Sequence, residues 1–467
     1  MFRRILIANR GEVAARVLRT CRRLGVEAVG VTTDPDQNLS YLKHFDAVVN
    51  LGGARGYLDM DALLAAAESE RCSAVHPGWG FLSENATFAA RCEASRLSFI
   101  GPRPLSMRQM GDKSEARRTM TRLGVAPIPG SDGPLPDAAA ASALAERMGY
   151  PVLLKALAGG GGRGMRRVYR PEDLSEAFQQ AAAEGEGAFG NGALYMEKLI
   201  ERGRHIELQV LGDGRGEVAV LGARECSVQR RHQKLLEETP PPATSEAALA
   251  EISGRLMAAL RVMRYRGAGT VEMLEDERGE IWFMEMNTRL QVEHTVTEEV
   301  TGLDLVEAQL RIAAGHSLDA TRAASLRPGG APGGHAIQCR INAEDTRANF
   351  RPSPGLVSRL RLPVGEAHPG VRVDTHLAEG DRISPHYDSM IAKVIAHGAD
   401  RAEAISRMRA ALSALVVEGV PTTAPAHLTV LADPDFQAGR YDTTFLSRFP
   451  DLAGTAPAAE APLEARS

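Results

Sequence analysis

The sequence predicts a multidomain protein of mixed α/β and α+β class. The chain has 467 residues, more than a single hydrophobic core usually organises. Strand-like and helix-like patterns alternate over residues 1–111, which is typical of a doubly wound parallel sheet. Later strand-rich sections are separated by glycine- and proline-rich connectors, which predict further domains of α+β type.

The N-terminal section contains short apolar runs that predict strands, with helical patterns such as 12–25 between them. A Rossmann dinucleotide site would require G-x-G-x-x-G directly after the first strand. That turn offers Gly11 alone, so this type of nucleotide site is excluded. The predicted strands are 3–8, 26–33, 46–51, 72–78 and 97–102.

The next section begins with a charged pattern at 110–125, which predicts one helix, and a proline- and glycine-rich connector at 127–136. A small α+β subdomain that could move as a lid is expected after it. This subdomain is expected at 138–200, with strands within 150–168 on both sides of a glycine-rich turn, a helix at about 171–184 and a strand at 193–200. A further strand is predicted at 204–213, beyond the subdomain.

The third section is predicted at 331–447. It opens with a strand pattern at 333–345 and ends in a helix at 401–415. Residues 448–467 are rich in alanine and proline and lack periodic apolar positions, which predicts a disordered tail.

Composition excludes several classes of function. A net charge of −4 provides no basic field for nucleic acid. The five cysteines are scattered without C-x-x-C spacing, which argues against a disulfide framework and a structural zinc site. No apolar stretch approaches the ~20 residues of a membrane span, and the N-terminal run is too short for a signal peptide. We therefore expect a cytoplasmic protein without a membrane partner.

Polar residues alternate along EMNTRLQVEH, residues 285–294. Every second residue carries a charged or amide side chain: Glu285, Asn287, Arg289, Gln291 and Glu293. In an extended chain these five side chains would point to one face.

A hairpin is predicted before this stretch, because two apolar runs flank DERG within residues 269–287. If Glu275 pairs with Glu280, then Glu272 and Glu285 lie roughly 5–8 Å apart on one face. Two such carboxylates, with Asn287 as a neutral oxygen donor, would suit Mg²⁺. The alternative is an exposed hairpin with solvated acids.

A second motif places Lys155 before the glycines of 159–164, where backbone N–H groups can approach an anion. It lacks the Walker Gly-Lys-Ser/Thr pattern, and a flexible linker is an equal alternative. A third motif, CSVQRRHQK at 226–234, carries Gln229, His232 and Lys234. Alone it is typical of a solvated face. Carboxylates for a metal, an anion loop and a basic cluster in one chain together favour phosphoryl chemistry.

These residues resemble the biotin carboxylases of the ATP-grasp superfamily. The resemblance extends to about residue 447. It implies a biotin carboxylase N-terminal domain at 1–111, an ATP-grasp fold at 112–330 with a mobile lid at about 130–200, and a biotin carboxylase C-terminal domain at 331–447. The segments that carry it are HPGWGFLSEN, MGDK, GGGGRGM, MEKLI, RECSVQRRHQK, EMNTRLQVEHTVTE, CRINAED and HYDSMIAK.

The resemblance implies an ATP-dependent ligase that carboxylates biotin with bicarbonate through carboxyphosphate, giving carboxybiotin, ADP and phosphate. Mg²⁺, or Mn²⁺ in its place, would be held by Glu272, Glu285 and Asn287. Glu293 would be the general base, with Arg289, Arg340 and Lys234 as the other catalytic groups. Bicarbonate and biotin would be bound by Lys234, Arg289, Gln291, the backbone of Val292, and Arg340. The nucleotide would be bound by Lys113, Lys155, Gly161, Gly162, Glu197, Lys198, Leu199, Ile200, His205, Gln229, His232, Glu272 and Glu285.

Two positions depart from the family pattern. Trp79 stands where the family usually has Tyr, which puts packing on the biotin side in doubt. Thr443 and Thr444 stand near the place of a C-terminal His, which puts the family's usual nucleotide affinity in doubt.

The chain contains no Met-Lys-Met triplet, so we expect biotin to arrive on a separate biotin carboxyl carrier protein, with a carboxyltransferase on another chain. A homodimer is implied by the resemblance. The final carboxyl acceptor is not encoded in this chain. Two alternatives are half of a carbamoyl-phosphate-type synthetase and a catalytically silent scaffold that binds nucleotide.

Overall fold

The N-terminal section forms a five-stranded parallel sheet of order β3-β2-β1-β4-β5, as predicted. The computed structural model describes residues 1–157, 164–325, 333–449 and 452. Apolar strand residues such as Leu6 and Val29 are fully buried between the helices that connect the strands. The elements are β1 (Arg4–Ile7), α1 (Gly11–Leu24), β2 (Glu27–Thr32), β3 (Ala47–Asn50), α2 (Met60–Ser69), β4 (Ala74–His76), α3 (Ala86–Ala94) and β5 (Ser98–Phe99).

The charged pattern at 110–125 forms two helices, not the single helix predicted. These are α4 (Pro104–Gly111) and α5 (Lys113–Arg122). Asp112 lies between them in an extended conformation, and its side chain accepts a hydrogen bond from the N–H of Glu115. The aspartate therefore caps a new helix and ends the previous one.

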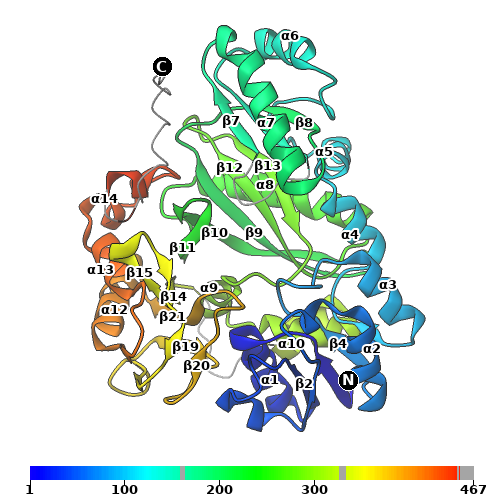
Figure 1. The fold of residues 1–467 in the computed structure, drawn as a ribbon, viewed down its shortest axis with the longest axis vertical. Coiled ribbons are helices and arrows are strands. Elements are labelled where there is room, and N and C mark those ends of the chain that lie inside the picture. The colour runs from blue at the N-terminus through cyan, green and yellow to red at the C-terminus, as the bar shows by residue number, and fades with distance from the viewer. Residues whose placement is uncertain (158–163, 326–332, 450–451, 453–467) are drawn as a thin grey trace, which may run out of the picture.

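Residues 138–198 form a small α+β unit that stands apart from the rest of the chain at the top of Figure 1. Its three-stranded antiparallel sheet has the order β7-β6-β8, and Leu154, Leu174 and Met196 belong to a separate hydrophobic cluster. Such a self-contained core is what a lid needs in order to move as one body. The elements are α6 (Ala138–Met148), β6 (Val152–Ala156), β7 (Met165–Val168), α7 (Leu174–Phe189) and β8 (Leu194–Lys198).

An eight-stranded antiparallel sheet holds the rest of the protein together, in the order β13-β12-β9-β10-β11-β14-β21-β19. It runs without a break across residue 331, because β11 pairs with β14. The strands are β9 (Arg204–Asp213), β10 (Val218–Arg230), β11 (Gln233–Thr239), β12 (Arg266–Glu275), β13 (Ile281–Asn287), β14 (His335–Asn342), β19 (Val371–Thr375) and β21 (Met390–Gly398).

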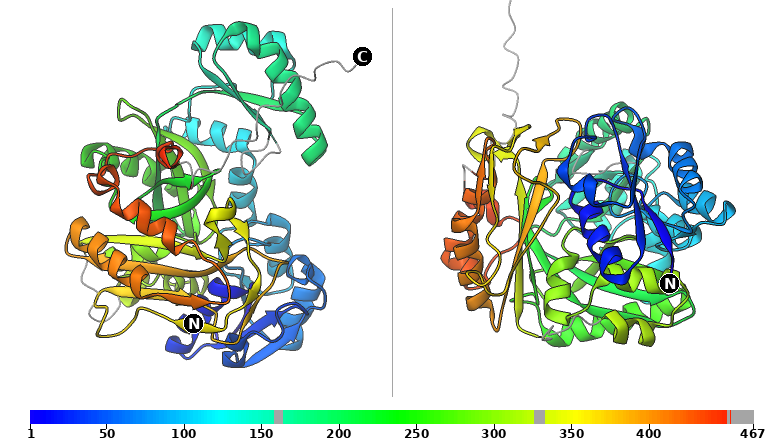
Figure 2. Two further views of the ribbon diagram at one scale, coloured as in Figure 1. Left: turned by 60° about the vertical axis from the view of Figure 1, so that its left-hand side comes forward. Right: turned by 90° about the horizontal axis from the view of Figure 1, so that it is seen from below.

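Helices cover this sheet, and short two-stranded β-ribbons complete the last section (Figure 2). One large hydrophobic cluster includes Val17 of α1, Leu211 of β9, Ile337 of β14 and Ala404 of α12, so it spans the first and last sections. The helices are α8 (Glu246–Val262), α9 (His294–Thr301), α10 (Leu305–Ala313), α11 (Leu318–Ser325), α12 (Arg401–Ala414), α13 (Ala424–Ala432) and α14 (Pro434–Gln437). The ribbon strands are β15 (Glu344–Asp345), β16 (Arg351–Pro352), β17 (Gly355–Leu356), β18 (Arg359–Arg361), β20 (Arg382–Ile383) and β22 (Val416–Glu418).

Within the described part of the chain, no helix combines the length and the apolar character that crossing a membrane requires. Most of the predicted tail, namely 450–451 and 453–467, lies outside the described residues.

Candidate active site

The β12–β13 hairpin forms as predicted but in a different register. Glu275 pairs with Ile281 rather than with Glu280. The side chain of Asp276 accepts the N–H of Glu280, and the N–H of Asp276 donates to the carbonyl of Glu280, so the turn includes one residue more than expected. These are side-chain and backbone contacts inside the turn, which the apolar pattern of the flanking strands does not report.

A bulge between Glu272 and Met273 then brings Glu272 directly opposite Glu285, where a diagonal relation was expected. Burial raises the pKa of Glu285, repulsion from Glu272 raises it further, and Lys113 lowers it in part. Burial would also raise the pKa of Glu272, but Lys234 and His205 hold it well below its usual range. The pair therefore carries negative charge that a divalent cation would neutralise.

The extended conformation predicted for 285–293 ends at Asn287, because β13 stops there and Glu293 is the N-cap residue of α9. The side chains still converge, through hydrogen bonds across a turn. The amide nitrogens of Asn287 and Gln291 donate to Oε1 of Glu272 at 2.8 and 3.2 Å. Arg289 donates to the amide oxygens of Gln291 at 2.9 Å and of Asn287 at 3.0 Å.

Lys234 on β11 is the cation at the centre of this cluster. Its Nζ donates to Glu207 at 2.6 Å, to Glu293 at 2.7 Å and to Glu272 at 3.1 Å. Burial lowers the pKa of Lys234, but the three carboxylates outweigh it and hold that pKa well above its usual value. The lysine is therefore a fixed positive charge with a ring of acidic partners.

Glu207 and Arg224 complete the cluster, although no sequence motif indicated a role for them. Arg224 is fully buried and donates to Glu207 and, at 2.8 Å each, to Gln209 and Thr297. A signal was present, because His205, Glu207 and Gln209 alternate along β9. Alternating polar residues are typical of a strand surface that faces solvent, but these three side chains are buried.

Glu293 is completely buried and lies between two cations. Its Oε1 accepts from Lys234 at 2.7 Å and its Oε2 from Arg340 at 2.9 Å. Burial alone would raise the pKa of Glu293, but Lys234, Arg340 and Arg224 hold it well below its usual range. The side chain is therefore an ionised proton acceptor whose position is fixed by its partners.

The lid contributes a second group of predicted residues. Lys155 on β6 and Arg117 on α5 both donate to the carboxylate of Glu197 on β8. The ammonium of Lys198 donates to two carbonyl oxygens in the 149–150 segment, at 2.9 Å each, and Leu199 and Ile200 follow it at the end of β8. The structure thus places these residues together at one edge of the lid, whereas Gly161 and Gly162 lie outside the described residues.

His205 connects Glu272 to Gln229. Its Nε2 lies 3.0 Å from Glu272 and its Nδ1 lies 2.6 Å from the amide nitrogen of Gln229. His232 lies exposed at the turn between β10 and β11 with a positive φ of 64°. The segment with Thr443 packs against the start of β9, since its N–H donates to the carbonyl of Gly203 at 2.9 Å.

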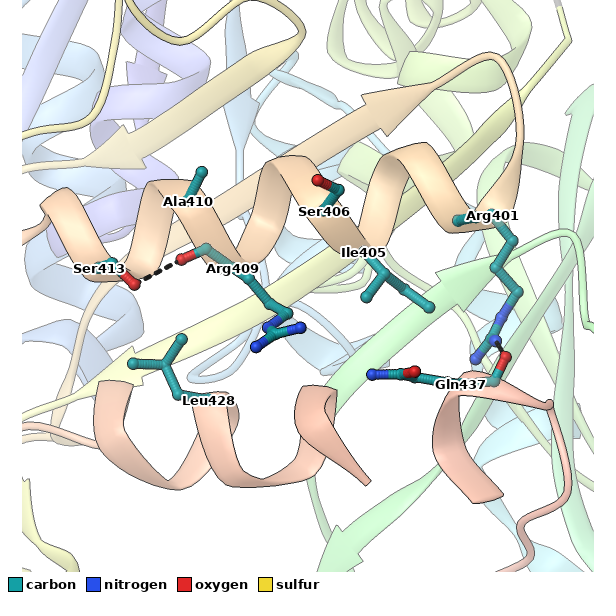
Figure 3. A pocket seen from close by; sticks show the side chains of 9 residues that line it. Arg401, Ile405, Ser406, Arg409, Ala410, Ser413, Leu428 and Gln437 are labelled. Carbon is teal, nitrogen blue, oxygen red and sulfur yellow. Dashed lines mark hydrogen bonds between the residues drawn. The ribbon is translucent and has the colours of Figure 1, made fainter. Parts of the chain in front are cut away.

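A cavity of about 880 Å³ lies elsewhere, between α12 and the helices that follow it (Figure 3). Arg401, Ile405 and Arg409 line one side of it, and Leu428 and Gln437 the other. It is an open surface groove, and its lining includes none of the predicted site residues.

Three family models match this chain in succession. The biotin carboxylase N-terminal domain matches residues 1–107, the ATP-binding domain of the carbamoyl-phosphate synthase L chain matches 112–321, and the biotin carboxylase C-terminal domain matches 338–448. The central model is named for carbamoyl-phosphate synthase, and both flanking models are named for biotin carboxylase. The carbamoyl-phosphate alternative therefore accounts for the middle of the chain only.

Relatives found by sequence and by solved structure match this chain over nearly its full length. A biotin carboxylase of Nostoc is 47% identical, covering 95% of this chain and 98% of that protein. A component of the pyruvate carboxylase of Methanothermobacter thermautotrophicus is 43% identical, with 96% and 90% covered. A Campylobacter jejuni biotin carboxylase structure is 44% identical with a TM-score of 0.90, covering 96% and 99%.

The biotin carboxylase domain of the Hydrogenobacter thermophilus 2-oxoglutarate carboxylase is 41% identical with a TM-score of 0.90, covering 98% and 99%. That structure is described as a dimer in complex with MgADP, ADP and bicarbonate. The expected fold class, with its central ATP-grasp architecture, is thereby confirmed. The chain belongs to the biotin carboxylase family.

Proposed function

We propose that this chain is the biotin carboxylase component of an acyl-CoA or related carboxylase and that the cluster around Lys234 and Glu293 is its active site. The reaction is the MgATP-dependent carboxylation of biotin with bicarbonate, through carboxyphosphate, to give carboxybiotin, ADP and phosphate. The observation that carries the assignment of the site is the fully buried Glu293 carboxylate, which is held between Lys234 and Arg340 beside the Glu272–Glu285 pair.

The metal site of this proposal consists of Glu272, Glu285 and Asn287. Its residues fit a hard divalent cation such as Mg²⁺ or Mn²⁺, because two carboxylates face each other and the pKa of Glu285 is raised by burial and by their repulsion. When bound, the cation would neutralise phosphate charge. The amide oxygen of Asn287, which here accepts from Arg289, would have to turn toward it.

The nucleotide would lie between the lid and the eight-stranded sheet. Lys113 and Lys155 would bind phosphate groups, with Gly161 and Gly162 covering them, while residues 197–200 would contact the base through backbone groups. Lys155 would exchange its carboxylate partner Glu197 for phosphate, which an ammonium binds as a point charge. His205, Gln229 and His232 complete this proposed site.

Bicarbonate would bind where Arg289, Gln291 and the backbone of Val292 face Lys234. The planar guanidinium of Arg289 already donates along two directions to amide oxygens, a geometry that suits a planar oxyanion. Glu293 would take the bicarbonate proton. Because Lys234 lowers the basicity of this carboxylate, we expect the lysine to turn toward the anion as the proton moves.

On the biotin side, Arg340 would stabilise the enolate-like oxygen that forms when the ureido nitrogen loses its proton to phosphate. Arg340 donates to Glu237 at 2.6 Å as well as to Glu293, so its guanidinium is held from two sides. Trp79 lines a small cavity with Asn9, Glu12 and Met390. This cavity adjoins β21, the strand that carries Lys393.

The remaining assignments are part of the same proposal. The division at 1–111, 112–330 and 331–447 is supported by the three family matches, which fall in that order. A homodimer is supported by the dimeric Hydrogenobacter relative. Biotin would arrive on a separate carrier protein, and a separate carboxyltransferase would choose the acceptor, which differs between the pyruvate and 2-oxoglutarate carboxylases among the relatives.

The test is the rate of ADP release by the purified chain with MgATP and free biotin, with and without bicarbonate. We expect release that depends on both bicarbonate and biotin. If the rate of ADP release depends on neither bicarbonate nor biotin, and adding a biotinylated carrier domain does not change this, the chain is a nucleotide-binding scaffold and the proposal is wrong.

A further inference from the structure

The backbone carbonyls of two successive residues, Gln291 and Val292, accept hydrogen bonds from side chains that have no role in the proposed reaction. The carbonyl of Gln291 accepts from Nδ1 of His294 at 2.8 Å. The carbonyl of Val292 accepts from Nζ of Lys393 at 3.0 Å. Both His294 and Lys393 have no solvent exposure. This is the segment whose backbone is proposed to bind bicarbonate.

Lys393 is placed by strand register. It lies on β21 directly opposite Arg340 of β14 and directly opposite Asp374 of β19. Arg340 and Lys393 therefore share one face of the sheet, and they bind the neighbouring residues Glu293 and Val292. The ammonium also lies 3.0 Å from the carboxylate of Glu12 on α1, which is buried as well.

The two carbonyl contacts fix the direction of two N–H groups. A peptide unit is planar and trans, so its N–H points away from its C=O. The carbonyl of Gln291 shares a peptide plane with the N–H of Val292, and the carbonyl of Val292 shares one with the N–H of Glu293. Holding both carbonyls toward His294 and Lys393 turns both N–H groups to the opposite side.

Stability alone is a poor reason for a buried lysine at this position. A fully buried ion pair such as Lys393 with Glu12 usually contributes no more stability than apolar residues of similar volume. The ammonium does what an apolar side chain could not, because it donates to a backbone carbonyl next to the proposed base. His294 likewise needs its Nδ1 proton for the Gln291 contact, since a carbonyl oxygen only accepts.

We propose that Lys393 and His294 are positioning residues that orient the backbone N–H groups of Val292 and Glu293 toward bicarbonate. They act on the peptide planes and make no contact with the anion themselves. This inference rests on the proposed function, because it assumes that bicarbonate binds at this segment. It predicts that the KM for bicarbonate depends on both side chains while the KM for ATP does not.

The test compares two variants in the biotin-dependent ADP-release assay. E12Q removes the carboxylate charge beside Lys393 and leaves the ammonium that donates to the Val292 carbonyl in place. The double variant E12Q/K393M removes the ammonium that donates to the Val292 carbonyl. Like the wild-type ion pair, its two side chains carry no net charge together. We expect the double variant to raise the bicarbonate KM by about tenfold, the usual scale for one misaligned hydrogen bond to an anion. E12Q should stay within about threefold of wild type, and the ATP KM should stay within about twofold in both variants.

Each result of this comparison either supports or contradicts the inference. The inference is wrong if E12Q/K393M shows a cooperative thermal unfolding transition, and is therefore folded, and if its KM for bicarbonate equals that of E12Q. If the double variant does not fold, H294F is measured instead. It exchanges ring for ring without a change of charge, because burial holds the pKa of His294 well below its usual value. An unchanged bicarbonate KM in folded H294F would overturn the inference, and a raised one would support it. A wild-type protein without bicarbonate-dependent turnover would instead refute the proposed function.

Discussion

Replacing Glu293 by glutamine tests the central chemical assignment. The substitution retains the size of the side chain and removes its ability to accept a proton. The fold should tolerate it, because Lys234 keeps Glu207 and Glu272 as partners and Arg340 keeps Glu237. The main structural cost is that the amide nitrogen of the new side chain faces either Lys234 or Arg340. This contact should lower the unfolding free energy by about 1–3 kcal/mol.

The kinetic cost should be larger. A positioned general base contributes roughly 10²–10⁴-fold to the rate. At about 1.4 kcal/mol for each factor of ten, this corresponds to about 3–5.5 kcal/mol of transition-state stabilisation. We therefore expect E293Q to lose at least about a hundredfold in bicarbonate-dependent turnover. Its affinity for ATP should change little, since the side-chain hydrogen bonds of Glu293 within the described residues go to Lys234 and Arg340, which lie outside the lid.

The assay is bicarbonate- and biotin-dependent ADP release, with nucleotide binding measured separately by calorimetry. Glu225 on β10 provides a matched control. It is also fully buried, and burial raises its pKa to about 8, so at pH 7 it is already protonated and glutamine is a close replacement. E225Q should retain turnover within about twofold. An E293Q protein that is folded, binds ATP and turns over bicarbonate within about tenfold of wild type would refute the role of Glu293 as base.

Three further predictions concern metal binding and stability. E285Q should raise the unfolding free energy without Mg²⁺ by about 1 kcal/mol, because it relieves repulsion from the opposite carboxylate. The same variant should need at least about tenfold more Mg²⁺ for half-maximal turnover, and a lower or equal requirement would remove Glu285 from the metal site. Glu225 binds its proton more tightly in the folded protein, with a pKa of about 8 against an ordinary value of 4.5. Wild-type stability should therefore fall by up to about 5 kcal/mol as the pH rises from 4.5 to 8, and about 2.7 kcal/mol of this fall lies between pH 6 and pH 9. E225Q should lack that fall of about 2.7 kcal/mol when both proteins are unfolded in guanidinium at pH 6 and pH 9. Finally, Arg401 donates to both carboxylate oxygens of the buried Glu238 at 2.7 and 2.9 Å. R401M should cost about 3 kcal/mol in urea unfolding at pH 7, whereas R409M on the exposed face of the same helix should cost less than about 0.5 kcal/mol, and equal losses would contradict this account.

Much of the fold could be predicted because it depends on local patterns. Short apolar runs between amphipathic helices indicated the parallel sheet, and the glycine-rich turn between two strands indicated the β6–β7 hairpin. The division of 110–125 into two helices was missed because a capping aspartate such as Asp112 resembles any other charged residue on a helix surface. The register of the β12–β13 hairpin was missed because the apolar pattern of the two strands reports neither the contacts of Asp276 inside the turn nor the bulge at Glu272.

The candidate site was predictable to the extent that its residues are close in sequence. Glu285, Asn287, Arg289, Gln291 and Glu293 do converge, although by a turn and hydrogen bonds rather than along one strand. Distant partners could not be recognised from pattern alone. Glu207, Arg224 and Lys393 come from separate strands, and only the sheet register brings them to the same cluster.

Because the eight-stranded sheet is continuous, two separately produced fragments could form the proposed catalytic centre only by pairing β11 with β14. A fragment ending near residue 330 would retain Lys234 and Glu293, but it would leave β11 as an edge strand with unpaired backbone groups where Cys339 and Ala336 normally pair. Such an exposed edge promotes aggregation. A fragment beginning near 331 would carry Arg340 on an equally unprotected strand. Co-expressed, the two pieces would have to find each other through this ladder before either could work, so recovery of activity would report directly on strand association.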